Sequence, residues 1–286
     1  MESRLAENRR AFDGVAADYD GPLGNNLLIQ RMRLRLWQTI EASLAPGSRL
    51  LDLGCGTGLD AVHLALRGYQ VLATDWSPRM VARTQARIES SGVGASATAQ
   101  LIGLHQLDRL DGERFDGIYS DLGPLNCAPD LAEVAGAAAR LLRPGGLFVA
   151  SVIGRRCPWE ALYYILRGDL DRARVRSRRG SVPVGLNGNT VWTRYFTPGE
   201  FYREFAGAFE LRSYRGLGLF LPPPYLLHVY RRWPRLFAAC AWLDDRLGAL
   251  PAVREAGDHF LIVLARRASA NRVVFGEVGL VGDGWC

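Results

Sequence analysis

The sequence predicts an α/β fold built on a doubly wound, mostly parallel β-sheet. Short apolar segments alternate with amphipathic helical segments after residue 48, as they do when right-handed crossovers join parallel strands. Turn-forming and helix-capping residues stand between these segments. The chain has 286 residues, of which 48% are hydrophobic and 22% charged, so it contains enough apolar material for a sizeable core.

Five candidate strands follow one another in the alternating region. In chain order they are 49–54, 70–75, 97–102, 115–121 and 147–153. A helix near 58–67 separates the first two and ends at Gly68, a residue suited to the left-handed position after a helix. Ser77 and Pro78 predict the N-cap and first turn of the next helix, and Asp130 caps the helix before the fifth strand.

The ends of the chain predict a helical lid, an inserted cap and two closing strands. Asn25 or Asn26 caps a helix in the lid, and the cap combines a short aromatic helix with a hairpin that turns at "LNGN". Thr197 and Glu200 form a capping box after it. The predicted parts are a lid at 1–45, a core at 46–153, a cap insertion at 154–196, closing strands within 197–267 (209–220 and 259–266) around a helical cap segment at 221–257, and a C-terminal tail at 268–286.

The composition argues against several classes of protein. No apolar run approaches the 18 residues of a membrane span, and the polar start "MESRLAENRR" does not read as a signal peptide. Five widely spaced cysteines predict free thiols in a reducing cytoplasm rather than disulfides. The four histidines show no metal-ligand spacing with the cysteines, so we expect no metal site.

The chain has a net charge of +6. It contains no lysine, so all of its positive side-chain charge comes from arginines. The segment 167–179, "RGDLDRARVRSRR", holds six arginines against two aspartates. Arg172, Arg174, Arg176 and Arg178 alternate, so on a strand they would share one face. A solvated outer face is the usual meaning of such a run. The other partners of a basic chain are nucleic acid, an anionic membrane surface and an acidic small molecule.

A glycine-rich turn follows the first strand in "RLLDLGCGTGLDA". Glycines at 54, 56 and 58 let a ligand or backbone approach closely. Leucine at 59 departs from the G-x-G-x-x-G pattern of dinucleotide enzymes. Asp52 would repel a pyrophosphate and would favour an ammonium or sulfonium group. Asp75, at the end of the second strand, is placed to accept hydrogen bonds from ribose hydroxyls.

These residues resemble the S-adenosylmethionine-dependent methyltransferases of the class I fold. The resemblance rests on "LLDLGCGTG", on "VLATDWS" one strand–helix unit later, and on "RLLRPGGLFV" before the fifth strand. It covers residues 45–153, and more loosely the closing strands around 209–266. It implies an α/β, doubly wound, mostly parallel seven-stranded sheet with an inserted α+β substrate cap, and S-adenosylmethionine as the cofactor.

The resemblance also implies a set of cofactor-binding residues. The turn under the methionine and ribose parts would consist of Gly54, Cys55, Gly56 and Gly58. Asp52 would lie near the methionine amino group with water between, Asp75 would hold the ribose, and Trp76 would flank the adenine.

The adenine edge of the site departs from the family pattern. Family members often have an aspartate after the third strand, but "LIGLHQLDRL" has no acid before Asp108. The backbone near Leu104 and His105 would hold the adenine instead, with Asp108 as an outside candidate. Tyr19, from the lid, completes the set of cofactor-binding candidates.

The loop "SDLGPLN" after the fourth strand bears on the methyl acceptor. It lacks the N/D-P-P-Y/F motif of amino-group methylases and looks like loops of small-molecule methyltransferases. Asn126 would then lie near the transferring methyl, although a turn-forming asparagine is an equally good reading. His228, beside Tyr225 and Tyr230, is the candidate general base, although a packing or surface histidine is the commoner case.

The predicted function is therefore O- or C-methylation of a small, partly apolar metabolite, by in-line transfer from S-adenosylmethionine. The aromatic cap and Arg231, Arg232 and Arg235 leave open a membrane-surface enzyme that acts on a quinone or isoprenoid lipid. An RNA methyltransferase is less favoured, because no appended nucleic-acid-binding module is visible. A non-catalytic adenosylmethionine-binding protein remains a further alternative. The sequence predicts no oligomeric state.

Overall fold

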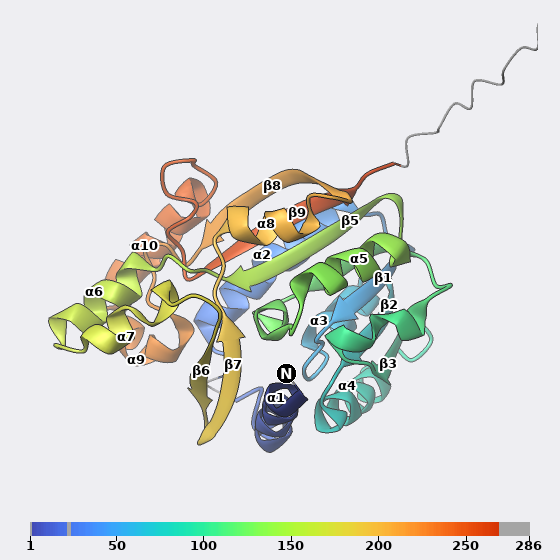
Figure 1. Cartoon of the computed structure of the whole chain (residues 1–286), viewed down its shortest axis with the longest axis horizontal. Coiled ribbons are helices and arrows are strands. Elements are labelled where there is room, and N and C mark those ends of the chain that lie inside the picture. Colours follow the sequence, from blue (N-terminus) through green and yellow to red (C-terminus); the bar gives the residue numbers. More distant parts are fainter. Residues whose placement is uncertain (1, 22–23, 269–286) are drawn as a thin grey trace, which may run out of the picture.

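The computed structural model describes residues 2–21 and 24–268, and most of the predicted tail at 268–286 lies outside them. A seven-stranded sheet runs through the molecule in the order β3-β2-β1-β4-β5-β9-β8 (Figure 1). Its strands are β1 (Arg49–Leu53), β2 (Gln70–Asp75), β3 (Ala97–Leu101), β4 (Phe115–Ser120), β5 (Leu142–Ile153), β8 (Phe209–Leu217) and β9 (His259–Arg266). The first five strands are parallel, and β9 runs antiparallel to both β5 and β8. The predicted fold class is confirmed.

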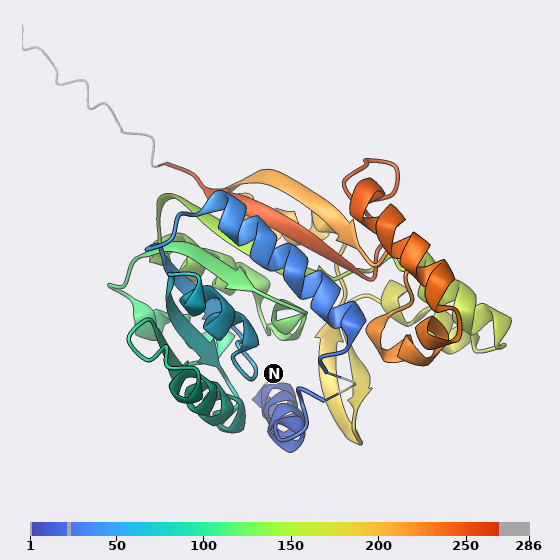
Figure 2. The same ribbon diagram turned by 180° about the vertical axis from the view of Figure 1, so that it is seen from behind.

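Helices cover both faces of the sheet. They are α2 (Leu27–Ser43), α3 (Leu59–Leu66), α4 (Pro78–Ser90), α5 (Leu131–Leu141) and α8 (Pro198–Phe205). Figure 1 shows α5 and α8 on the near face, and Figure 2 shows α2 across the opposite face. On one face, Phe201 and Phe205 of α8 pack together with Phe148 of β5 and Phe209 of β8. On the other face, Leu36 and Ile40 of α2 pack against the sheet. No helix in the described residues has the length and apolar character that a membrane crossing requires.

Most of the predicted helix caps are confirmed. The side chains that cap α2, α4, α5 and α8 are those of Asn26, Ser77, Asp130 and Thr197, and Thr197 forms the expected capping box with Glu200. Such caps satisfy amide groups that the first helical turn leaves without a partner. Local sequence signals therefore determine where these helices begin.

The N-terminal helix α1 (Glu2–Val15) packs on a hairpin formed by β6 (Ser181–Leu186) and β7 (Asn189–Arg194). The side chain of Asn8 accepts a hydrogen bond from the Trp192 amide (2.7 Å) and donates to the Trp192 carbonyl (3.2 Å). Glu7 accepts another from the Trp192 indole (2.6 Å). The hairpin turns at Asn187 and Gly188 as predicted, both with positive φ. The lid and the hairpin thus form one unit.

The short helices η1 (Leu104–Leu110) and η2 (Pro124–Cys127) follow β3 and β4, and six further helical segments lie together at one end of the molecule (Figure 1, left). They are α6 (Pro158–Leu166), α7 (Leu170–Ala173), η3 (Val175–Ser177), η4 (Pro224–Leu226), α9 (Leu227–Arg232) and α10 (Pro234–Leu247). An aromatic contact between Trp159 and Phe237, with ring centroids 6.4 Å apart, joins α6 to α10. We call this group of helices the cap end.

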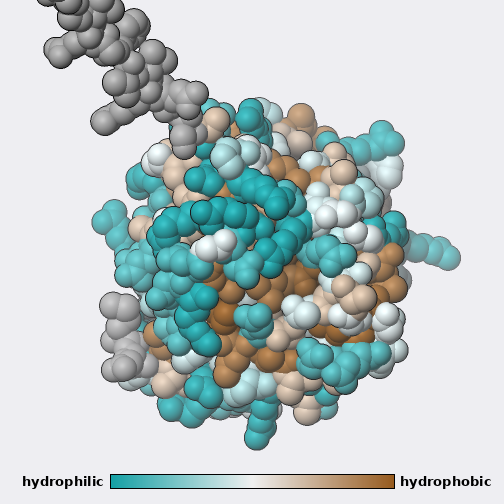
Figure 3. Space-filling model, turned by 90° about the vertical axis from the view of Figure 1, so that its right-hand side faces the viewer, coloured by the Kyte–Doolittle hydropathy of each residue, from teal (hydrophilic) through white to brown (hydrophobic). Residues whose placement is uncertain are grey.

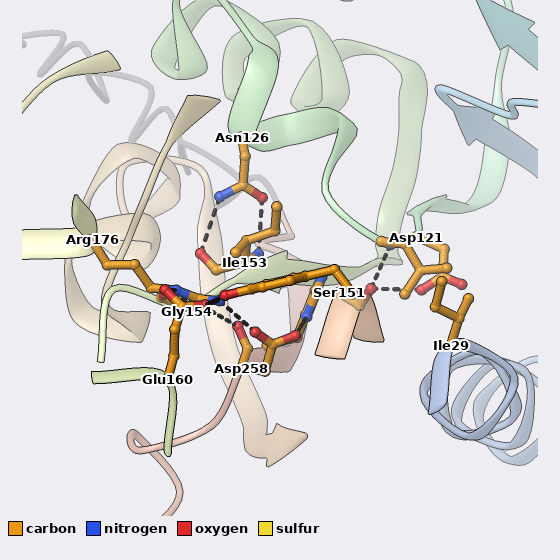
Figure 4. Close-up of polar contacts among 12 residues, drawn as sticks. Ile29, Asp121, Asn126, Ser151, Ile153, Gly154, Glu160, Arg176 and Asp258 are labelled. Carbon is orange, nitrogen blue, oxygen red and sulfur yellow. Dashed lines mark hydrogen bonds and ion pairs between the residues drawn. The ribbon is translucent and has the colours of Figure 1, made fainter. Parts of the chain in front are cut away.

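The arginine run at 167–179 is solvated as predicted except at one position, because all of its arginines other than Arg176 are exposed. It forms helical turns rather than a strand, and Arg176 is buried, with only 7% of its surface exposed. Its guanidinium donates to both carboxylate oxygens of Glu160 (2.6 and 3.0 Å), to a carboxylate oxygen of Asp258 (2.5 Å), and to the carbonyls of Gly154 and Asp258 (Figure 4). All five N–H groups therefore have acceptors, because the segment folds back against the start of β9 instead of extending.

This buried arginine joins the cap end to the sheet. Burial alone would raise the pKa of Asp258, but Arg176 and His259 hold that pKa well below its usual range. Glu160 and Asp258 also lie close to Cys157, a grouping that would suit a metal ion. Since Arg176 already compensates both carboxylates, we assign this cluster a structural role.

Replacing Arg176 by methionine should strongly destabilise the protein. The substitution keeps the length of the side chain but leaves Glu160 buried without a counter-charge and Asp258 with His259 alone, which costs about 3–5 kcal/mol. Urea denaturation measures the change. Arg178→Met is the matched control, since the Arg178 side chain is 55% exposed, and it should change stability by about 0.5 kcal/mol or less. Similar losses in the two variants would contradict this role for Arg176.

Candidate functional site

A cavity of about 270 Å³ lies at the carboxyl ends of the parallel strands. The strand order reverses between β1 and β4, and open α/β sheets bind their ligands at such a point. The walls come from α1, the turn after β1, the end of β2, the loops after β3 and β4, and the β6–β7 hairpin. Seen from the side of α4 and β3, apolar side chains gather near the centre of the surface among hydrophilic ones (Figure 3).

Each position of the turn after β1 that holds a glycine requires it for a different physical reason. All three have positive φ, which glycine adopts without strain. A Cβ at Gly54 would lie 2.4 Å from Pro124, and one at Gly58 would lie 2.7 Å from Thr84, so these positions allow two neighbouring segments to approach. A Cβ at Gly56 would meet only the ring of Tyr19, 3.7 Å away, and both residues line the cavity.

Asp75 connects this turn to the end of β2. Its carboxylate accepts hydrogen bonds from the amides of Gly56 (3.0 Å) and Ser77 (2.8 Å). Burial raises the pKa of Asp75 to about 6, even though these hydrogen bonds oppose the rise. Its two oxygens thus have fixed orientations at the cavity wall, which is what recognition of a pair of hydroxyl groups requires.

The remaining predicted cofactor-binding residues fall into two groups. Cys55, Trp76, Leu104 and His105 line the cavity together with Tyr19, and Asp108 is not among the lining residues. The rings of Trp76 and His105 meet edge to face, with centroids 4.5 Å apart, and burial lowers the pKa of His105. These side chains form one wall beside Asp75.

Asp52 does not line the cavity as the resemblance implied. It is fully buried, and one of its carboxylate oxygens has no hydrogen-bond partner. Burial and the nearby charge of Asp60 raise the pKa of Asp52 well above its usual range. The carboxyl is enclosed because β1 is an interior strand, with β2 and β4 paired on its two sides and helices over its faces.

Arg33 and Asp121 are among the charged residues that line the cavity and that the sequence did not single out. Arg33 of α2 pairs with Asp60 (2.6 Å), and its Nε has no partner. Asp121, at the end of β4, accepts a hydrogen bond from Ser151 (2.6 Å) on one oxygen, while its other oxygen has no partner (Figure 4). Burial and Asp60 raise the pKa of Asp121 to about 6, against the lowering effect of Arg33.

Only one of these two residues had a sequence signal. Asp121 belongs to "SDLGPLN", the loop in which the prediction favoured Asn126. Arg33 lies in an amphipathic helix with several other arginines, and nothing in the pattern distinguishes it from them.

Asn126 has a different position from the one predicted for a catalytic residue. Its amide donates to the carbonyls of Ile153 (3.0 Å) and Arg194 (2.7 Å) and accepts from the Ile153 amide (2.9 Å) (Figure 4). It is buried and is not among the cavity-lining residues. Because backbone groups occupy its amide, Asn126 fixes the loop after β4 against the ends of β5 and β7.

His228, the predicted general base, lies away from the cavity. This residue is exposed on α9, with the Tyr163 hydroxyl 3.4 Å from its Nε2, and it does not line the cavity. Its neighbour Leu227 is buried among apolar residues of the cap end. Packing of that side of the helix turns His228 outward.

Comparison with known proteins gives a consistent result. Residues 50–146 match the family described as "Methyltransferase domain". The chain is 37% identical over 158 residues to a demethylmenaquinone methyltransferase of Beutenbergia cavernae, which is 53% of this chain and 61% of that protein. It is 31% identical over 172 residues to a ubiquinone biosynthesis O-methyltransferase of Alkalilimnicola ehrlichii, which is 60% of this chain and 64% of that protein. The chain thus spans less than two thirds of either relative.

Solved structures resemble the chain over a longer stretch. A SAM-dependent methyltransferase from Methanosarcina mazei matches with a TM-score of 0.57 and 20% identity, and the match covers 80% of this chain and 97% of that one. At this identity the likeness concerns the fold.

Replacing Asp52 by asparagine should stabilise the protein near neutral pH. The folded state favours the protonated carboxyl, whereas the unfolded chain ionises near pH 3.9. Folding therefore loses stability as the pH rises above that value. We expect a gain of about 0.5–2 kcal/mol at pH 7, which shrinks as the pH falls toward 4. Urea denaturation at several pH values measures it. Asp111→Asn, at an exposed aspartate, should show no such gain, and a destabilised Asp52→Asn protein would contradict the argument.

Proposed function

We propose that this chain, which carries the methyltransferase domain of the class I S-adenosylmethionine-dependent enzymes, methylates an oxygen or carbon atom of a small apolar acceptor of the quinone or phenol type. One observation carries the proposal. A single cavity combines the ordered carboxylate of Asp75 with the unpartnered polar atoms of Arg33 and Asp121. That combination suits a ligand with a ribose at one end and charged groups at the other.

The cavity residues fit the cofactor of this family. Asp75 would accept hydrogen bonds from the ribose hydroxyls, and Trp76 with His105 would enclose the adenine. Arg33 would pair with the methionine carboxylate, because it offers an unpartnered N–H group in the cavity wall. When bound, S-adenosylmethionine supplies a methyl group on a positively charged sulfur.

The rest of the cavity suits an apolar acceptor. Its wall includes apolar side chains from the lid, from β5 and from the hairpin, namely Leu5, Phe12, Ile153, Val184, Leu186 and Val191. These side chains would exclude water and align the acceptor, which lowers the barrier by up to about 7–11 kcal/mol when the geometry is good. The names of the two curated relatives place their substrates in menaquinone and ubiquinone biosynthesis, which supports a quinone-type ring here.

Asp121 is the proposed proton acceptor in place of His228. It lies at the end of β4 with one oxygen held by Ser151 and the other directed to no protein partner. A carboxylate with a pKa of about 6 is largely ionised at neutral pH, and it is more basic than an ordinary aspartate. It would take the proton of an acceptor hydroxyl as the new oxygen–carbon bond forms.

Gly56→Ala should weaken cofactor binding without unfolding the protein. The added Cβ would extend into the cavity, where only Tyr19 is near, so it would compete with the ligand for space. We expect a loss of at least about tenfold in affinity, or 1.4 kcal/mol, by calorimetric titration with S-adenosylmethionine. Gly92→Ala is the matched control, since Gly92 also has a left-handed φ of +69° and has open space around it. Equal affinities in the two variants would refute this cofactor site.

Asp121→Asn should lower turnover by about 10²–10⁴-fold if the acceptor is a hydroxyl, the range for a lost general base. The assay uses methyl-labelled S-adenosylmethionine and short-chain prenylated catechols and hydroquinones as probes. In the parent protein, kcat/KM should fall about tenfold per pH unit below pH 6, because only the ionised carboxylate accepts the proton. The exposed His228 provides the control, and His228→Gln should keep the parental rate and pH profile.

Two results would contradict this proposal at different levels. Turnover of Asp121→Asn within about threefold of the parent would exclude Asp121 as the general base. Alignment of the acceptor would then remain as the source of catalysis. Intact cofactor binding with no labelled product from any of the probes would overturn the acceptor class.

A further inference from the structure

The cap end exposes a concentration of large apolar side chains. Among the described residues, 14 large apolar side chains are exposed, and nine of them belong to the cap end and the segments next to its helices. These nine are Leu162, Ile165, Leu166, Leu170, Tyr225, Trp233, Leu236, Trp242 and Leu250. Soluble monomers rarely expose large contiguous apolar areas without a function.

The apolar side chains of α6 occupy one side of that helix. Leu162, Ile165 and Leu166 have the i, i+3, i+4 spacing of a single helical face, and Leu166 is 78% exposed. Trp159 packs inward against Phe237 of α10. The helix therefore already has its interior contact, and the leucine face is an additional, unpartnered surface.

The same part of the chain carries all of the net positive charge. Segments 154–180 and 221–257 contain 13 arginines and six acidic residues, a net charge of +7, whereas the whole chain has +6. Exposed arginines stand next to the exposed apolar residues, namely Arg167, Arg172, Arg174, Arg231, Arg232 and Arg235. The rest of the chain has no positive excess.

We propose that the cap end binds peripherally to the surface of an anionic lipid bilayer. Leucines and isoleucine would enter the acyl boundary, Trp233 and Trp242 would lie at the level of the headgroups, and the arginines would meet lipid phosphates. Tryptophan prefers this interface because its ring is apolar and its N–H is polar. Long arginine side chains reach headgroups while their stems remain in apolar surroundings.

The charge pattern favours lipid over a second copy of the chain. Segments 154–180 and 221–257 carry a net charge of +7 in each copy, so two copies that met through these segments would repel each other. The exposed apolar residues also belong to several separate helices, which Figures 1 and 2 show at this end. Arginines lie between these residues in the sequence. Anionic headgroups neutralise such a surface, and acyl chains adapt to its uneven relief.

Docking at this end would bring the candidate active site close to the lipids. Residues 154–180 lead directly into the β6–β7 hairpin, and Val184, Leu186 and Val191 of that hairpin line the cavity. Arg176 holds the segment rigidly against the sheet. Delivery of the apolar acceptor from the bilayer rests on the proposed function. Docking of the cap end to lipid does not depend on that function.

Vesicle flotation of the full chain tests the proposal. The protein should float with phosphatidylcholine vesicles that contain 30% phosphatidylglycerol and remain unbound with phosphatidylcholine alone. Replacing Leu162 and Leu166 by serine should abolish flotation. Leu66→Ser, at a leucine of α3 that is 64% exposed, should leave it unchanged.

A charge variant tests the electrostatic part. Arg231→Gln with Arg232→Gln should weaken binding to the anionic vesicles about 30-fold, because each arginine near the surface contributes about 1 kcal/mol. Arg109→Gln with Arg203→Gln removes two exposed arginines elsewhere and should leave binding unchanged. Calorimetric titration with S-adenosylmethionine should give parental affinity in every variant, which separates this test from the proposed function.

Three outcomes would overturn the proposal. The first is equal binding to neutral and anionic vesicles, and the second is parental flotation of the Leu162 and Leu166 variant. The third is the absence of flotation together with a dimer in light scattering that this variant dissociates, which would assign the surface to a second copy of the chain.

Discussion

The buried guanidinium of Arg176 fixes the cap end against the central sheet. It bridges Glu160 of the cap end and Asp258 at the start of β9, and it also binds two backbone carbonyls. A buried charge is tolerated only when it is paired and fully hydrogen-bonded, and each of its five N–H groups has an acceptor. Since the hairpin follows directly after this segment, one ion cluster sets the position of the cap end and of a cavity wall.

The cavity itself is electrostatically costly. Asp52 and Asp121 are buried near the turn and Asp75 is half-buried there, and loss of hydration raises the pKa of each carboxyl. Arg33 partly compensates this charge, but it is already paired with Asp60. A ligand with positively charged sulfur and nitrogen atoms would favour the ionised carboxylates. Its binding would therefore offset part of the free-energy cost of burying these carboxylates. The raised pKa values thus fit a site shaped for a cation rather than for a pyrophosphate.

Much of the framework could be predicted because its signals are local. The glycine turn, the helix caps and the alternation of strands and helices depend on residues close in sequence, and the structure confirms them. The environments of Asn126, His228 and Arg176 could not be predicted from the local sequence, because they depend on contacts distant in the chain. Asn126 meets Arg194, and Arg176 meets Asp258, across 68 and 82 residues. The alternating arginines would share one face only on a strand, but the segment forms helical turns in which Arg176 meets two buried carboxylates.

The position of Asp121 shows how one element can serve both the fold and the chemistry. Ser151 of β5 donates to its carboxylate and accepts from the amide of Leu122, so the loop after β4 is tied to β5 at two points. Asn126 ties the same loop to the end of β5 and to β7. The first set of bonds fixes the carboxylate of a cavity-lining residue, and the second brings the hairpin wall against the same loop. A shift of the cap end would therefore reach the proposed proton acceptor through β7 and Asn126, so we infer that Asn126 positions the loop between the proposed lipid-facing surface and the proposed site of methyl transfer.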